Sequence, residues 1–123
     1  MQPKITPSNM RKMAFAVMEY LAKSDLWIGT TMYVDGKVWS SEEGYAHDKK
    51  TTEKGTVYYE GERDPDSVLQ YFNRETLTMS FEGPLYDAIN GGDGSVLNHI
   101  NKIFDRYGLY AEQGYPWSLA AYP

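Results

Sequence analysis

An apolar stripe with helical spacing follows directly on a helix-start signal near the beginning of the chain. Thr6 can cap a helix, and Pro7 suits the first helical position. Only Lys12, Glu19 and Lys23 mark a narrow polar edge along this stretch. The pattern therefore predicts a helix that is buried over most of its surface, through Met10, Met13, Ala14, Phe15, Val17, Met18 and Leu21.

From residue 26 the apolar period switches from helical to alternating, which is typical of strands. Asp35-Gly36 has the residue types of a two-residue type I′ turn, and this turn pairs Tyr33 with Val38 across a β-hairpin. If the alternation runs unbroken, the hairpin has two faces of different composition. We expect the core face to carry Leu26, Ile28, Met32, Val34 and Trp39, and the opposite face to carry Trp27, Tyr33 and Val38.

The remaining segments alternate between strand and helix patterns. Residues 56–61 predict a strand, and residues 75–83 alternate most clearly, with Leu77, Met79 and Phe81 inward. Helices are predicted over residues 63–73, 84–90 and 95–108, the last ending at a left-handed glycine. Two stretches leave alternatives: residues 42–55 form an exposed loop or an irregular hairpin end, and residues 109–122 form two short strands or one bent strand.

This order of helices and hairpins predicts an α+β fold. We expect two layers, in which an antiparallel-rich or mixed sheet carries the first and last helices on one face. The chain has 123 residues and shows no linker, internal repeat or low-complexity segment. Residues 1–123 are therefore expected to form a single α+β domain, because domains of roughly 100–150 residues are the commonest.

Composition and charge argue against several classes of function. The chain has no cysteine, so thiol catalysis, disulfide scaffolds and cysteine-based zinc sites are excluded. Its net charge of −5 and its scattered Lys and Arg argue against nucleic acid as a partner, since binding to the phosphate backbone needs clustered cations. No apolar run approaches the roughly 18–20 residues of a membrane span, and the N-terminal stretch lacks signal-peptide features. We expect a cytoplasmic protein without membrane contact.

A glycine-rich stretch, NGGDGS at residues 90–95, raises the question of a phosphate-binding loop. Its spacing matches neither the dinucleotide-binding fingerprint nor the P-loop. The carboxylate of Asp93 would also repel a phosphate. We therefore predict a joint between two helices, in which Gly91 or Gly92 ends the first and Asp93 or Ser95 caps the second. No cofactor is expected.

Candidate catalytic groups are few. His47 lies in a charged loop, and His99 adjoins the apolar stripe of the last helix. Neither histidine has a partner at metal-ligand spacing, so no metal site is expected. Glu82 at the end of a strand is the best-placed carboxylate for acid–base work, and Asp87 follows on the next turn. An enzyme would use Glu82, Asp87 or His99 in a cleft lined by Tyr86 and Tyr110.

The aromatic content gives the main functional hypothesis. The chain has 11 Tyr and 3 Trp, and both residue types are enriched in binding surfaces. We predict a non-catalytic binding protein whose partner is another protein or a second copy in a homodimer. A small-ligand-binding protein or an enzyme is the alternative. By analogy of size and charge alone, inhibitors and regulators encoded by phages or mobile elements are comparable proteins. The predicted contact patch, on the sheet face that the helices leave open, comprises Trp27, Tyr33, Tyr58 and Trp117.

Overall fold

The structure is a layer of helices packed on one antiparallel sheet. The computed structural model describes residues 5–62 and 76–123, and the helix predicted over residues 63–73 lies outside the described residues. In chain order the described elements are α1 (Pro7–Lys23), β1 (Thr30–Val34), β2 (Lys37–Ser40), β3 (Asp48–Thr51), β4 (Val57–Glu62), β5 (Leu77–Phe81), α2 (Pro84–Asn90), α3 (Ser95–Asp105), β6 (Tyr110–Gln113) and β7 (Ser118–Tyr122).

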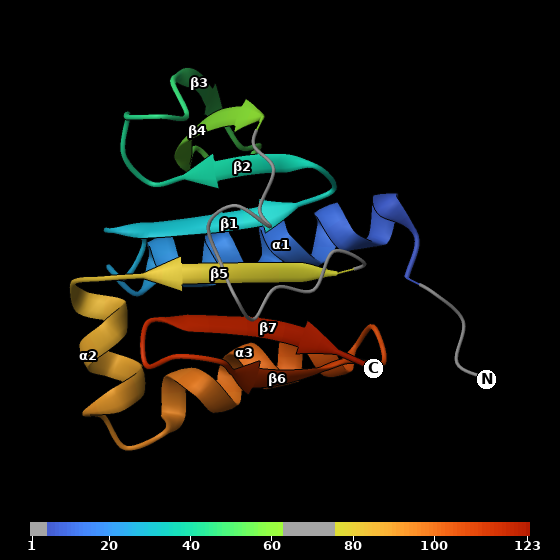
Figure 1. Ribbon diagram of the computed structural model, residues 1–123, viewed down its shortest axis with the longest axis vertical. Helices are drawn as coiled ribbons and strands as arrows, with labels where there is room; N and C mark the ends of the chain where they lie inside the picture. Colours follow the sequence, from blue (N-terminus) through green and yellow to red (C-terminus); the bar gives the residue numbers. More distant parts are fainter. Residues whose placement is uncertain (1–4, 63–75) are drawn as a thin grey trace.

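The strand order across the seven-stranded sheet is β3-β4-β2-β1-β5-β7-β6, and each neighbouring pair is antiparallel. Figure 1 shows α1 and α3 behind the same face of this sheet, while α2 lies at the end where β1 begins and β5 ends. The predicted α+β fold with helices on one face is confirmed. None of the described helices is long and apolar enough to cross a membrane.

Local sequence signals determine α1 and the first hairpin. The Thr6 hydroxyl accepts a hydrogen bond from the Asn9 N–H at 3.1 Å, so the predicted cap is present. In the hairpin turn, Asp35 and Gly36 have φ angles of 50° and 72°, the left-handed values that a type I′ turn requires. The predicted pairing across β1 and β2 is confirmed. The buried side of α1 consists of Met10, Met13, Ala14, Val17, Met18 and Leu21.

The segment before β1 breaks the predicted alternation. The strand begins only at Thr30, and Asp25 and Gly29 adopt left-handed φ angles of 59° and 63°. Each of these residues redirects the chain, so side chains before Thr30 do not continue the faces of the strand. Ile28, predicted to point inward, is 51% exposed, whereas Trp27, predicted to point outward, is 9% exposed and belongs to the main core. The predicted faces are wrong at these two positions.

The later strands agree with their patterns. In β5, Leu77, Met79 and Phe81 are buried as predicted, and Thr78 on the opposite side is buried too. Residues 42–55 include β3, which pairs with β4 as the irregular end of a hairpin. The tail forms two strands, β6 and β7, which pair with each other at one edge of the sheet.

The glycine-rich stretch is a joint between α2 and α3, as predicted. The Gly91 N–H donates to the Asp87 carbonyl at 2.8 Å and ends α2. An Asp93 carboxylate oxygen accepts from the Ser95 N–H at 2.9 Å, and this hydrogen bond lowers the pKa of Asp93 below its ordinary value. The carboxylate therefore supports the first turn of α3, where a phosphate would otherwise have to bind.

The joint gives a first testable prediction, at Gly92. A Cβ added there would lie 2.4 Å from the Ala88 carbonyl oxygen, a backbone atom that cannot turn aside. We expect Gly92→Ala to lower the free energy of unfolding by about 2 kcal/mol, in the range of overpacked sites. Gly44→Ala is the matched control, because its Cβ would meet nothing within 4 Å, and it should change stability by no more than about 0.5–1 kcal/mol. Urea denaturation of both variants measures the difference, and equal stability would show that the joint is not tightly packed.

Candidate functional site

The predicted aromatic patch does not exist as one exposed surface. Trp27 and Tyr58 are 9% and 7% exposed and lie in the main core, on the side of the sheet that α1 covers. Tyr33 is 4% exposed and packs in a separate cluster with Val38. Only Trp117, at 37%, is substantially exposed. The prediction of a shared exposed face is therefore wrong for three of its four members.

Tyr58 has an aromatic partner on α1, and Trp27 belongs to the same core cluster as the buried side of α1. Phe15 of α1 stacks on Trp39 with ring centroids 4.4 Å apart, and its ring lies 5.7 Å from that of Tyr58. The indole N–H of Trp27 donates to the Val57 carbonyl at 3.0 Å, so its polar atom is satisfied inside the protein. Burial also raises the pKa of the Tyr58 hydroxyl. These rings stabilise the fold.

The fourth residue of the predicted patch, Trp117, lines a hollow of about 480 Å³ together with Glu82, Gly83 and Tyr86. Glu82 and Gly83 follow β5, Tyr86 lies on α2, and Trp117 precedes β7. The Phe81 N–H donates to the Trp117 carbonyl at 2.8 Å, so the pairing of β5 with β7 places Trp117 beside Glu82. We call these four residues the aromatic hollow.

Side-chain hydrogen bonds hold the two sides of the aromatic hollow together. The Asn90 amide donates to the Tyr86 carbonyl at 3.0 Å and to the Pro116 carbonyl at 2.8 Å, which ties α2 to the β6–β7 loop. Gln113 in turn donates to the Asn90 side-chain oxygen at 3.2 Å. The ring of Tyr115 stacks on Trp117 with centroids 4.7 Å apart. The exposed indole is therefore held in place before any partner arrives.

The surface continues from the hollow along the start of β1. The Gly29 carbonyl accepts from the Glu82 N–H at 2.8 Å, and the Gly29 N–H donates to the Glu42 carboxylate at 2.9 and 3.0 Å. Ile28, the residue before Gly29, has an exposed side chain. This end of the sheet thus combines exposed apolar side chains with carboxylates.

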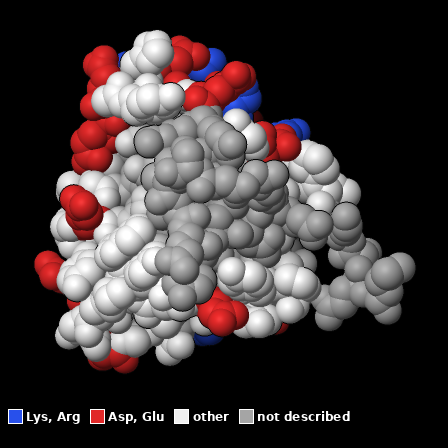
Figure 2. Space-filling view, in the orientation of Figure 1, with Lys and Arg blue, Asp and Glu red and all other residues white. Residues whose placement is uncertain are grey.

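No Lys or Arg occurs in the four segments that meet at this end, residues 28–31, 41–44, 82–91 and 113–118. The same segments carry four carboxylates, and Figure 2 shows acidic side chains along the left edge, on the side of α2 and the start of β1. The Lys and Arg visible in that view lie mainly near β3 and β4 at the top. The local field around the hollow is therefore negative. The four carboxylates are Glu42, Glu43, Glu82 and Asp87.

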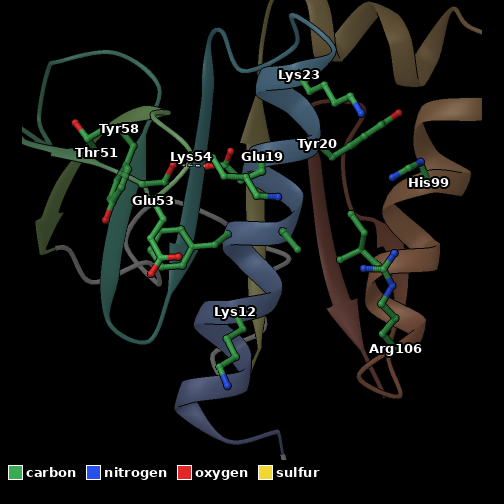
Figure 3. Close-up of a pocket in the computed structure, with 14 residues that line it drawn as sticks. Lys12, Glu19, Tyr20, Lys23, Thr51, Glu53, Lys54, Tyr58, His99 and Arg106 are labelled. Atoms are coloured by element: carbon green, nitrogen blue, oxygen red, sulfur yellow. Dashed lines mark hydrogen bonds between the residues drawn. The ribbon is translucent and has the colours of Figure 1, made fainter.

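The residues of the predicted catalytic cleft are not brought together. Glu82 and Tyr86 share the hollow, but Asp87 does not line it. Tyr110 lies at the start of β6, opposite Tyr122, which is the other end of that hairpin from Trp117. His99 stacks on Tyr20 of α1 and, with Tyr58, lines a separate groove around α1 (Figure 3). Among the described residues there is no group of three or more His, Asp or Glu side chains that could hold a metal ion.

The arrangement of the hollow is suited to binding a cation that carries apolar groups. Trp and Tyr ring faces attract Lys or Arg head groups, and a carboxylate in the same hollow can accept a charge-assisted hydrogen bond. Comparisons with protein-family models, curated proteins and solved structures found no match to this chain.

Proposed function

We propose that the protein is a non-catalytic binding protein and that the aromatic hollow is its contact surface. The observation that supports this most is that the exposed side chains of Trp117 and Tyr86 line one hollow together with Glu82, while Asn90 ties together the two segments that carry these rings. Exposed aromatic side chains that are already ordered bind with little loss of rotamer entropy, which is a property of interface hot spots.

The partner that fits this surface is a protein with a protruding Lys or Arg side chain in an apolar setting. The four carboxylates around the hollow would attract such a basic surface and increase the rate of association. The apolar Ile28 beside the hollow would cover the stem of the bound side chain. We further propose that the protein acts in the cytoplasm as an inhibitor or regulator of this partner.

This proposal is tested by capturing the partner with hollow variants and matched controls. Tyr86→Ala removes one ring of the hollow. Glu82→Gln removes the negative charge of the Glu82 side chain without changing the size of that side chain. Tyr110→Ala and Glu112→Gln are the controls, because Tyr110 and Glu112 are exposed on β6, away from the hollow. The captured protein is identified by mass spectrometry, purified and titrated against all four variants by calorimetry.

We expect the two hollow variants to bind the purified partner about tenfold more weakly, a loss of about 1.4 kcal/mol, and the controls to bind like the unaltered chain. Added salt should weaken partner binding by the unaltered chain more than binding by Glu82→Gln, because the unaltered chain has one more charge for the salt to screen. Equal binding by hollow and control variants would contradict the proposal. A concentration-dependent homodimer that Tyr86→Ala abolishes would show that the occupant is a second copy instead.

A further inference from the structure

A larger groove of about 840 Å³ lies on the outward side of α1, on the face of the molecule that the helices cover. Figure 3 shows α1 in the middle of this groove, the β3–β4 turn on one side and α3 on the other. Ligand pockets usually measure about 300–1,000 Å³, so the groove has the size of a small-molecule site. It shares no residue with the aromatic hollow.

Four cations surround this groove in a chain whose net charge is −5: Lys12 and Lys23 on α1, Lys54 on the β3–β4 turn, and Arg106 after α3. Within the described part of the chain, none of the four forms an ion pair. Elsewhere, cations that lie near carboxylates do pair with them, as Arg11 does with Asp35 at 2.5 Å. The cations of the groove therefore have their charges available for a ligand.

The two carboxylates of the groove offset only part of this charge. Glu19 accepts hydrogen bonds from the hydroxyls of Thr52 and Thr56, so its oxygens are engaged with the β3–β4 turn. Glu53 lies on the same turn and is exposed. Four cations against two carboxylates leave an excess of positive charge, and an anion in the groove would be attracted.

Between the cations the groove is apolar and aromatic. Phe15, Ala16 and Ile103 line it. Tyr20 and His99 form a parallel ring stack with centroids 3.7 Å apart and an interplanar angle of 5°, which joins α1 to α3 across the groove. A ligand that only carried charge would leave this apolar surface in water. The lining fits a molecule that has both a negative group and an apolar or aromatic body.

We propose that the groove around α1 is a binding site for a small organic anion with an aromatic body. The aromatic body lies against Phe15, Ala16 and the Tyr20–His99 stack, and the surrounding cations attract the anionic group. This site is independent of the aromatic hollow, so its occupation does not require the protein partner.

The test uses two fluorescent probes that differ in charge: 8-anilinonaphthalene-1-sulfonate and its uncharged analogue N-phenyl-1-naphthylamine. The anionic probe should bind the unaltered chain, and its dissociation constant should rise at least tenfold between 50 and 500 mM salt, since salt screens exposed charges. The double variant Lys23→Gln/Arg106→Gln should raise the dissociation constant of the anionic probe by a similar factor. The control Lys49→Gln/Lys102→Gln removes the same net charge outside the groove and should bind normally. Far-UV circular dichroism checks that each variant is folded.

Three results would overturn the proposal: no binding of the anionic probe, equal affinity of groove and control variants, or equal affinity for the charged and uncharged probes. The salt titration uses the unaltered chain alone, so it decides the role of charge even if a double variant fails to fold.

Discussion

Trp27→Ala is expected to lower the free energy of unfolding by about 3–5 kcal/mol, because it removes a large core side chain. Trp27 packs in the main core beneath α1, and its indole N–H donates to the Val57 carbonyl at 3.0 Å. The substitution leaves a cavity and an unpaired carbonyl. Small proteins have a total stability of about 5–15 kcal/mol, so the loss is a large share of it.

Urea denaturation followed by far-UV circular dichroism measures this loss without relying on the tryptophan that is removed. Trp117→Ala is the comparison within the same experiment, and it should cost less than Trp27→Ala because Trp117 is 37% exposed whereas Trp27 is 9% exposed. A stable Trp27→Ala variant that no longer binds the partner would contradict the structure. It would instead favour the exposed patch that the alternating pattern predicts.

Trp117→Ala has the largest expected effect on binding. An exposed tryptophan held in position by a neighbouring stack and by the pairing of β5 with β7 has the properties of a hot spot. We expect the dissociation constant for the partner to rise about 30-fold or more, which corresponds to on the order of 2 kcal/mol. Calorimetry with the purified partner measures the change, and most of it should appear as faster dissociation.

Tyr45→Ala is the matched control for this variant. Tyr45 is the most exposed of the large apolar side chains in the described chain, at 68%, and it does not line the aromatic hollow. Its substitution should leave the dissociation constant unchanged. If Tyr45→Ala weakens binding of the partner as much as Trp117→Ala does, exposed aromatic area alone determines binding. The geometry of the hollow then has no special role.

Much of the fold was predictable because its signals are local. The Thr6 cap, the Met-rich stripe of α1 and the left-handed turn at Asp35-Gly36 each depend on residues within a few positions of one another. The alternation of β5 and the end of α3 at Gly108, where φ is 77°, are of the same kind. Local signals of this type determine the type and length of an element, and with hairpins they determine most of an antiparallel sheet.

The aromatic patch was not predictable by the same means. The placement of Trp27 depended on an unbroken alternation before Thr30, and the left-handed residues Asp25 and Gly29 interrupt it. Asp25 carries no strong sequence signal for φ above zero, and Gly29 adopts this conformation in only some contexts. These two interruptions accompany the burial of Trp27, which lies in the core and not on the predicted surface.

The aromatic hollow and the groove each combine one predictable part with one that depends on tertiary contacts. Glu82 and Tyr86 were identifiable at a strand-to-helix turn, but only the pairing of β5 with β7 brings Trp117 beside them. Likewise, Lys12 and Lys23 mark the polar edge of α1 in the sequence. Their arrangement with Lys54 and Arg106 results from packing between segments about 30–90 positions apart along the chain, which no local pattern encodes.

The tryptophan indole signals in a two-dimensional ¹⁵N–¹H NMR spectrum test the central claim most directly. The chain has three tryptophans, and a Trp117→Phe variant identifies the signal of Trp117. The indole N–H groups of Trp27 and Trp39 donate inside the protein, to Val57 and Glu60 at 3.0 Å each. On addition of the purified partner, we predict that the Trp117 indole signal shifts or broadens while the other two stay in place. An unchanged Trp117 signal, with shifts at Trp27 or Trp39 instead, would contradict the aromatic hollow as the contact surface.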